Sequence, residues 1–522
     1  MGRTRARAAG WWEFALLAAL GALQTLACVH TSLWWLPVLA VATLVARLAQ
    51  APTRRAAGLG LVFGASWLMA AVWWLFVSMH RYGGLPAWLA ALAVALLALA
   101  LALYLALACA LWVRLRSGRS GPDALAFAAC WLLAEWARGV IFTGFPWAAS
   151  GYTQIDGPLA AWAAWAGVYG VGAWMALAGA LLGLAWSRAG AHPPVPTRLR
   201  ARLWIAAGAV LALPGLTGPG EFTRSAGIQT VTLVQTAVPQ DEKFSGERLP
   251  ENLAWLADAL NRARGALVVA PETAVPLLPE QLAALAPGWW EALRLRFAGS
   301  AQVALVGVPL GDFESGYTNS AVGLAPAHAG SVAQPYRYDK VHLVPFGEFI
   351  PTGFRWFTDL MHIPLGDFSR GPLDAPSLNA GAQRVAPNIC YEDLFGEELA
   401  VRFLEPSRAP TVLANLSNIG WFGHTIALPQ HLNISRMRSL ELQRPMLRST
   451  NTGVTAIIDH RGRVTHRLEP FVRATLDGTY EGRDGLTPYA WWAARWGLWP
   501  LVALALVTLA WAAVRRRVAA DL

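Results

Sequence analysis

Three side chains that could form a thiol-based catalytic site lie far apart in this sequence: Glu272, Lys340 and Cys390. Each stands near the end of a strand-like run, and Cys390 is followed by Tyr391 and an acidic pair. A thiol has a pKa of about 8.5 and becomes a strong nucleophile only after losing its proton. A carboxylate can accept that proton, and an ammonium can stabilise the oxyanion formed when the thiolate attacks a carbonyl group.

Each of these residues also has an ordinary structural explanation. Glu272 follows Pro271 and could be a carboxylate at the start of a helix. Lys340 could be a surface lysine, and Cys390 a small buried apolar residue. Cys390 is nevertheless the only cysteine outside an apolar run, so it is either inert or a nucleophile. The presence of all three motifs together favours a catalytic site, and the other cysteines are Cys28, Cys109 and Cys130.

The composition indicates a membrane protein with a soluble insert. The 522 residues are 55% hydrophobic and only 14% charged, whereas soluble chains carry about 25% charged residues. Many of the 27 tryptophans stand in pairs at the edges of apolar runs, as is typical of membrane interfaces. The net charge of +10 comes from arginines in short loops between these runs, which membrane topology explains without a nucleic-acid partner.

Seven apolar runs are predicted to provide eight membrane spans, since a spanning helix needs about 20 mostly apolar residues. The first run divides into two spans at residues 30–32, and Pro214 weakens the seventh span. The expected spans lie within residues 14–46 (two spans), 56–79, 83–113, 124–139, 157–187, 203–220 and 496–514.

Arginines predict the orientation of these spans. They precede the first span, follow the last and fill alternate loops, which places both termini in the cytoplasm by the positive-inside rule. Seven crossings then put the insert on the opposite, periplasmic face of a bacterial inner membrane.

The basic N-terminus followed by an apolar run also resembles a signal peptide, but it lacks a convincing cleavage site, and more spans follow. We therefore expect a transmembrane domain at 1–220, a catalytic domain at 221–486, and a last helix with its tail at 487–522.

The insert alternates strand-like and helix-like runs, which predicts an α/β domain. Reactive groups collect at strand ends in such folds. Expected strands cover residues 228–235, 266–270, 302–308, 385–390, 411–415 and 454–459, the last followed by a hairpin turn at 460–463; expected helices cover 252–264 and 431–442.

Three strings resemble the Glu, Lys and Cys motifs of the nitrilase, or carbon–nitrogen hydrolase, superfamily: PET at 271–273, DKVHLVPFGE at 339–348 and NICYE at 388–392. Together with the eight spans, they make nearly the whole chain resemble the bacterial apolipoprotein N-acyltransferase family. The strings EWARG at 135–139 and FTGFPW at 142–147, and the segments 417–423 and 430–453, support this resemblance.

The resemblance implies a polytopic helical membrane domain joined to an αββα sandwich domain. It also implies that Cys390 takes an acyl chain from a phospholipid and passes it to the α-amino group of a diacylglyceryl-cysteine at a lipoprotein N-terminus. Glu272 would act as the general base and Lys340 would stabilise the oxyanion. Glu348 would orient Lys340 or the base. The bilayer holds both lipid substrates, and we expect a monomer without cofactors.

Tyr391 and Glu392 have two interpretations. They either shape the mouth of the acyl pocket or pack behind the site as supporting groups. The chain also departs from the family pattern at Thr236, Ala237 and Phe244, in a region that the resemblance assigns to a loop at the active-site mouth.

Glu135 and Arg138 fall in or near a span, where charges are costly unless paired or solvated. We expect them to pair near the outer face and to hold the spans under the catalytic domain.

Two other functions fit parts of the pattern. A membrane-anchored nitrilase or amidase shares the three motifs but needs only one span. A transporter or receptor accounts for the spans but not for the motifs. His424 and His431 lack the further ligands that a metal site needs.

Overall fold

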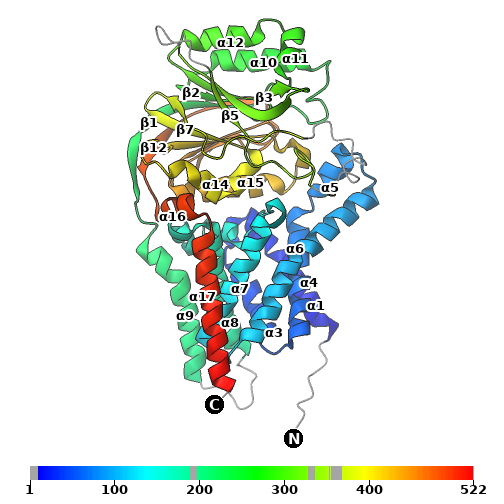
Figure 1. Cartoon of the computed structure of the whole chain (residues 1–522), viewed down its shortest axis with the longest axis vertical. Coiled ribbons are helices and arrows are strands. Elements are labelled where there is room, and N and C mark those ends of the chain that lie inside the picture. Colours follow the sequence, from blue (N-terminus) through cyan, green and yellow to red (C-terminus); the bar gives the residue numbers. More distant parts are fainter. Residues whose placement is uncertain (1–9, 188–196, 327–334, 352, 354–366, 521–522) are drawn as a thin grey trace. The chain divides into compact units, whose positions relative to one another are not determined.

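The computed structural model of the chain describes residues 10–187, 197–326, 335–351, 353 and 367–520. These residues form two compact units. Unit 1 comprises residues up to Trp73, Ala91–Pro219 and Leu498 onward, and unit 2 comprises Trp74–Ala90 and Gly220–Gly497. We describe each unit by itself, and Figure 1 shows the elements of both.

Within the described ranges, eight helical stretches are long and apolar enough to cross a membrane, which confirms the predicted number. They are Trp11–Val29, Thr31–Leu48, Thr53–Val72, Ala87–Leu115, Ser120–Thr143, Pro158–Ser187, Thr197–Thr217 and Trp499–Arg517. Their principal helices are α1 (Trp11–Leu23), α2 (Thr25–Val29), α3 (Trp35–Leu48), α4 (Thr53–Val72), α6 (Ala87–Leu115), α7 (Ser120–Val140), α8 (Ala163–Ser187), α9 (Thr197–Thr217) and α17 (Trp499–Ala520).

Two span boundaries differ clearly from the prediction. The third span was expected to reach Met79, but α4 ends at Val72 and is followed by the short helix α5 (Leu75–Val77) and the π-helix η2 (Ser78–Tyr82). The apolar run continues past Val72, so composition alone does not mark this end. The seventh helix begins at Thr197 rather than Leu203, because its first turns carry exposed arginines.

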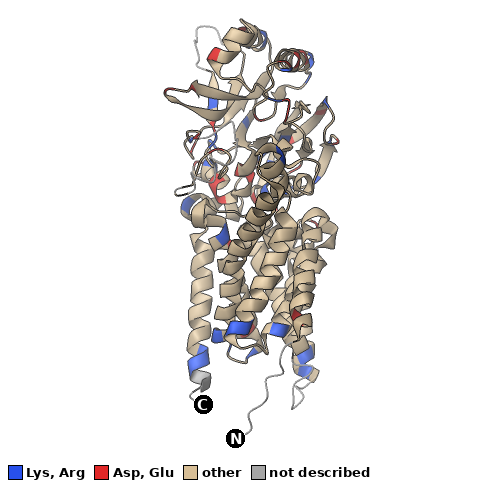
Figure 2. Ribbon diagram, turned by 90° about the vertical axis from the view of Figure 1, so that its right-hand side faces the viewer, with Lys and Arg blue, Asp and Glu red and all other residues tan. Residues whose placement is uncertain are grey.

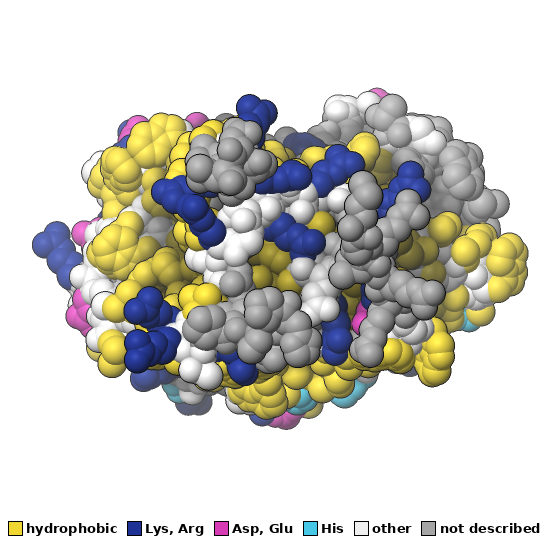
Figure 3. Space-filling view, turned by 90° about the horizontal axis from the view of Figure 1, so that it is seen from below, with side chains coloured by type: hydrophobic (Ala, Val, Ile, Leu, Met, Phe, Trp, Pro, Cys, Tyr) yellow, Lys and Arg dark blue, Asp and Glu magenta, His cyan; other side chains and the backbone are white. Residues whose placement is uncertain are grey.

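Charged residues are sparse along the long helices of unit 1 (Figure 2). Figure 3, seen from below, shows several Lys and Arg side chains spread over this face among apolar ones. The exposed arginines at the ends of the unit 1 helices or in the loop after α6 are Arg54, Arg114, Arg119, Arg198, Arg202, Arg515, Arg516 and Arg517.

Unit 2 contains two six-stranded sheets. The first sheet has the order β12 (Ala474–Gly485), β1 (Thr223–Gln235), β2 (Leu267–Val269), β3 (Val303–Asp312), β4 (Gly316–Leu324) and β5 (Tyr336–Asp339). The second sheet has the order β11 (Val464–Arg467), β10 (Ala456–Ile458), β9 (Met446–Thr450), β8 (Val412–Ser417), β7 (Gln383–Ile389) and β6 (Leu378–Ala380). The predicted hairpin at 460–463 joins β10 to β11, which pair antiparallel.

Helices cover the outer face of each sheet, which completes the predicted αββα sandwich (Figure 1). Residues such as Leu233, Leu305 and Leu416 from both sheets form one apolar core. α10 (Leu249–Arg262) packs on the first sheet because Leu253, Leu256 and Leu260 recur at helical spacing on one face. The other covering helices are α11 (Pro279–Leu285) and α12 (Trp289–Ala298) on the first sheet, and α14 (Gly396–Ala400), α15 (Ala427–Leu442) and α16 (Pro488–Trp496) on the second.

The segment Trp74–Ala90 belongs to unit 2, although it lies in sequence between two spanning helices. The Trp74 indole N–H donates to the Gln430 side chain at 3.1 Å. The Trp74 ring also packs 4.2 Å from the Phe422 ring, centroid to centroid. Arg81 forms an ion pair with Asp241 at 2.8 Å. This segment therefore packs against residues far away in the sequence.

Candidate active site

The structure brings Glu272, Lys340 and Cys390 to one site in unit 2. Cys390 directly follows β7, Lys340 directly follows β5, and Glu272 follows β2 after a two-residue turn. Gly307 of β3 makes room for that turn, because a Cβ there would lie 2.3 Å from the Pro271 carbonyl oxygen. All three predicted residues thus lie at strand ends, where α/β folds concentrate reactive groups.

Lys340 is bound between two carboxylates. Its Nζ donates to Glu348 Oε1 at 2.8 Å and to Glu272 Oε1 at 3.3 Å. The amide of Asn319 donates to the same two oxygens, at 2.7 Å for Glu272 and 2.9 Å for Glu348. The backbone N–H of Asn418 donates to Glu272 Oε2 at 2.7 Å. Lys340 is 1% exposed, which rules out the interpretation as a surface lysine.

These contacts keep both Glu272 and Lys340 charged. Burial favours the neutral form of Glu272, but the Lys340 ammonium and the Asn319 amide outweigh it and hold the pKa of Glu272 below its usual value. Burial likewise disfavours the charged form of Lys340, yet Glu272 and Glu348 raise the pKa of Lys340 above its ordinary value. The site therefore holds an ionised carboxylate and an ammonium near neutral pH.

Cys390 occupies a strained backbone position, with a φ of +53°. Burial and the Glu272 charge raise the pKa of the Cys390 thiol to about 12, and the Lys340 charge opposes them. The thiol is therefore protonated at rest, beside a carboxylate that carries no proton.

A buried polar network supports the Cys390 backbone. Its carbonyl oxygen lies 3.3 Å from both Asn415 Nδ2 and His431 Nε2. Because Arg448 can only donate, its 2.6 Å contact makes His431 Nδ1 the acceptor and leaves the ring proton on Nε2. That nitrogen also contacts Asp393 Oδ1 at 3.1 Å. Burial and the nearby Arg448 charge lower the pKa of His431, so the ring is neutral.

Glu392 connects the loop that carries Lys340 to the turn that carries Cys390. Its Oε1 accepts from the backbone N–H of Val341 at 2.6 Å, and its Oε2 accepts from the backbone N–H of Ile389. The Tyr338 hydroxyl donates to the same carboxylate at 2.8 Å. Glu392 is 3% exposed, which favours its interpretation as a supporting group.

Tyr391 is also buried. Its ring packs edge-on against Phe395 at 5.3 Å between centroids, and lies 5.7 Å from the His342 ring. These aromatic contacts fix the Tyr391 ring immediately after the nucleophile.

Sequence reasoning missed Lys243. This residue is 4% exposed, and its Nζ donates to the Glu272 backbone carbonyl at 3.2 Å and to the Thr273 hydroxyl. The available signal was indirect: β1 and β2 are parallel neighbours, so the loop after β1 reaches the same sheet edge as Glu272. A lysine in the polar string QDEK gave no reason to expect burial.

Two departures from the family pattern lie beside the missed lysine. The Thr236 hydroxyl donates to Asn451 Oδ1 at 2.7 Å. Ala237 has a φ of +46°, a region that asparagine tolerates better than alanine. Phe244 is 38% exposed. The loop after β1 is therefore anchored at its start and exposed beyond Lys243.

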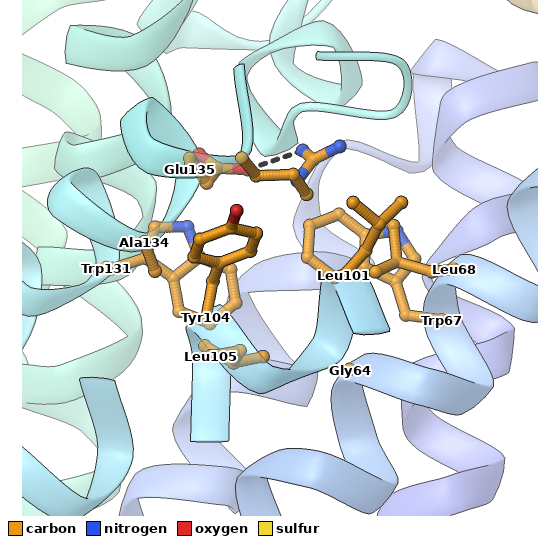
Figure 4. Close-up of a pocket in the computed structure, with 10 residues that line it drawn as sticks. Gly64, Trp67, Leu68, Leu101, Tyr104, Leu105, Trp131, Ala134 and Glu135 are labelled. Carbon is orange, nitrogen blue, oxygen red and sulfur yellow. Dashed lines mark ion pairs between the residues drawn. The ribbon is translucent and has the colours of Figure 1, made fainter. Parts of the chain in front are cut away.

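In unit 1, Glu135 and Arg138 form the predicted ion pair at 3.8 Å, and both residues are buried (Figure 4). Ser150 donates to Glu135 through its backbone N–H at 2.7 Å and its hydroxyl at 2.8 Å. The pair lies beside a pocket lined by α4, α6 and α7, including Trp67, Tyr104 and Trp131. The pairing is confirmed, and its role in holding the spans stays a prediction.

Two family models match the chain. The apolipoprotein N-acyltransferase N-terminal domain matches residues 20–181, and the carbon–nitrogen hydrolase domain matches residues 230–479. The second range contains Glu272, Lys340 and Cys390.

Relatives match over almost the full length. The chain is 50% identical to an apolipoprotein N-acyltransferase from Verminephrobacter eiseniae, over 93% of this chain and 94% of that one. It is 45% identical to one from Ralstonia nicotianae, over 96% and 93% of the two chains. A solved carbon–nitrogen hydrolase from Helicobacter pylori aligns with 53% of this chain and 94% of its own, at 15% identity and a TM-score of 0.35.

Proposed function

The chain belongs to the apolipoprotein N-acyltransferase family, and we propose that it transfers a fatty acyl chain from a membrane phospholipid to the N-terminal diacylglyceryl-cysteine of lipoproteins. The acyl chain passes through a thioester on Cys390. The observation that carries this proposal is the meeting of the buried Glu272 and Lys340 with the partly buried Cys390 at one site.

The first half-reaction begins with proton transfer from the Cys390 thiol to the Glu272 carboxylate. The thiolate attacks the ester carbonyl of the phospholipid, and the Lys340 ammonium stabilises the oxyanion. Collapse of the intermediate breaks the ester C–O bond, and Glu272 returns its proton to the lysophospholipid oxygen. The thioester remains on the enzyme.

In the second half-reaction the α-amino group of the lipoprotein attacks the thioester. Glu272 accepts the proton that the amine loses, and the Cys390 thiolate leaves and is reprotonated. The product is an amide. Two half-reactions through one covalent intermediate give ping-pong kinetics.

The supporting residues maintain the charge and the position of the catalytic side chains. Glu348 shares Lys340 with Glu272 and so keeps the lysine charged. Glu392 holds the Lys340 and Cys390 segments in register, and Tyr391 borders the acyl chain next to the sulfur. A single chain supplies all of these groups, so we expect a monomer without a cofactor.

Membrane helices suit this reaction. Each CH₂ group exposed to water costs about 0.8 kcal/mol, so neither lipid substrate leaves the bilayer readily. The exposed arginines at the ends of the unit 1 helices support an orientation with cytoplasmic termini and a periplasmic catalytic domain in the inner membrane.

Intact-mass analysis of protein purified from membranes tests the proposal. We expect a fatty acyl adduct on wild-type protein, absent from Cys390→Ala, that disappears when a diacylated lipopeptide with a free amine is added. The same lipopeptide with an acetylated amine is the control and should leave the adduct in place. An adduct that persists in Cys390→Ala contradicts the thioester, and discharge by water alone at the same rate favours a hydrolase.

A further inference from the structure

Lys243 is a buried cation that the mechanism above does not use. It lies in the segment after β1, and its Nζ donates to the backbone carbonyl of Glu272 and to the Thr273 hydroxyl. Thr273 has a φ of +46°, so the ammonium binds a strained turn that carries the base. Its charge interacts with the Glu272 carboxylate and with the Cys390 thiolate when that forms.

A count of charges gives this lysine a role. Glu272 and Glu348 supply two negative charges, and Lys340 supplies one positive charge. The protonated Lys243 balances the charges of these three groups. Transfer of the thiol proton to Glu272 does not change this sum, because one negative charge moves from oxygen to sulfur. Without Lys243 these groups carry a net negative charge away from water, where an unpaired ion is strongly disfavoured.

Lys243 also changes its protonation state near neutral pH. Burial lowers the pKa of Lys243 to about 7, against the opposing charges of Glu272 and Cys390. Lys340 contacts the Glu272 carboxylate and pairs with Glu348, and Asp241 of the same segment as Lys243 pairs with Arg81. Lys243 therefore loses its charge as the pH rises through neutrality.

We propose that Lys243 is the second cation of the site and that its protonated form promotes formation of the Cys390 thiolate. It acts as a positioning residue, through Glu272 and through its charge. This inference rests on the proposed role of Cys390 as the nucleophile.

The test is the rate at which iodoacetamide alkylates Cys390 in the full-length protein, followed from pH 6 to 9 by mass spectrometry of the peptide that contains residue 390. Wild type is compared with Lys243→Met, which removes the charge, and with Lys243→Arg, which keeps it at every pH. At pH 6.5 we expect Lys243→Met to react about tenfold more slowly than wild type, which corresponds to one unit of thiol pKa. Lys243→Arg should stay within about threefold of wild type.

The pH dependence separates charge from structural damage. The difference between wild type and Lys243→Met should narrow towards pH 9, where wild-type Lys243 is neutral, whereas Lys243→Arg should then exceed both. A ratio that stays constant across the pH range overturns the proposal, as does an unchanged rate in Lys243→Met.

Wild type alone provides a second test if Lys243→Met fails to fold. Its alkylation rate should rise less than tenfold per pH unit around neutrality, because Lys243 loses its charge over this range and then no longer stabilises the small thiolate fraction. A full tenfold rise per unit through this range contradicts the inference. Alkylation needs no acyl donor or acceptor, so this outcome is independent of whether acyl transfer itself is found.

Discussion

Both units bury a carboxylate next to a cation, and the two pairs differ in what surrounds them. In unit 1, Glu135 accepts two hydrogen bonds from Ser150, and Arg138 donates to the backbone carbonyls of Phe145 and Trp147 at 2.7 Å each. None of these partners ionises near neutral pH, so one positive charge faces one negative charge.

In unit 2, Glu272 shares Lys340 with a second carboxylate, and the Cys390 thiol interacts with that cluster. Burial of an ion pair is therefore not what marks the reactive site. The difference lies in a second carboxylate that shares the same cation, and in a neighbouring group whose proton can move. Each prediction below tests this difference.

The largest effect is expected for Glu272→Gln. This change removes the proton acceptor, so formation of the acyl-enzyme should slow by about 10²–10⁴-fold. Removing one of two carboxylates that share a lysine should change the melting temperature little. Single-turnover intact-mass measurements give the rate, and a rate within tenfold of wild type contradicts the role of Glu272 as the base.

The next effect concerns stability in unit 1. Arg138→Met or Glu135→Leu leaves one buried charge without its partner, which costs about 3–5 kcal/mol. Thermal unfolding in detergent measures this loss. The exchanged pair, Glu135→Arg with Arg138→Glu, should be more stable and more active than either charge reversal alone. No rescue by the exchange would count against pairing as the role of these residues.

A smaller effect, on the pH dependence of stability, is expected from His431 in the polar network that supports the Cys390 backbone. The folded protein holds His431 neutral, with its pKa lowered by burial and Arg448, whereas the unfolded chain protonates it below about pH 6.5. Stability is thus fully present above that pH and falls as the pH drops towards the folded pKa.

His431→Gln should flatten this slope, which urea unfolding at a series of pH values between 5 and 7 can measure. His424→Gln is the matched control, because His424 packs beside Phe471 away from the network. Equal slopes in wild type and His431→Gln would show that another group causes the acid sensitivity.

The smallest effect is expected for Trp74→Phe, which removes the indole hydrogen bond to Gln430. A single hydrogen bond contributes about 0.5–1.5 kcal/mol. Hydrogen exchange of the amides in residues 419–430 should accelerate accordingly. Trp73→Phe provides the control, because Trp73 is 41% exposed while Trp74 is 1% exposed. Equal acceleration in both variants would mean that ring volume matters more than the hydrogen bond.

The sequence predicts the spans and the three principal site residues for different reasons. A membrane span requires a long apolar run, and Glu272, Lys340 and Cys390 stand in motifs at the ends of short buried strands. The end of α4 at Val72 was not predictable, because the following residues are equally apolar and only their contacts distinguish them.

Residues whose roles depend on tertiary contacts are poorly indicated by the sequence. Lys243 lies among polar residues, and only the parallel pairing of β1 and β2 brings it to Glu272. His431 was weighed as a metal ligand, whereas its contacts with Arg448 and the Cys390 carbonyl depend on how α15 packs against β9. Such roles arise from distances between elements, which a residue pattern does not contain.

The segment Trp74–Ala90 has a consequence for anyone who divides this gene. A fragment that starts at Gly220 would lack the aromatic cover that Trp74 and Tyr82 give to Phe422 and Trp421, and would leave those rings bare to water. A chimera that exchanges membrane helices between relatives should therefore inherit residues 74–90 from the parent that provides the catalytic portion.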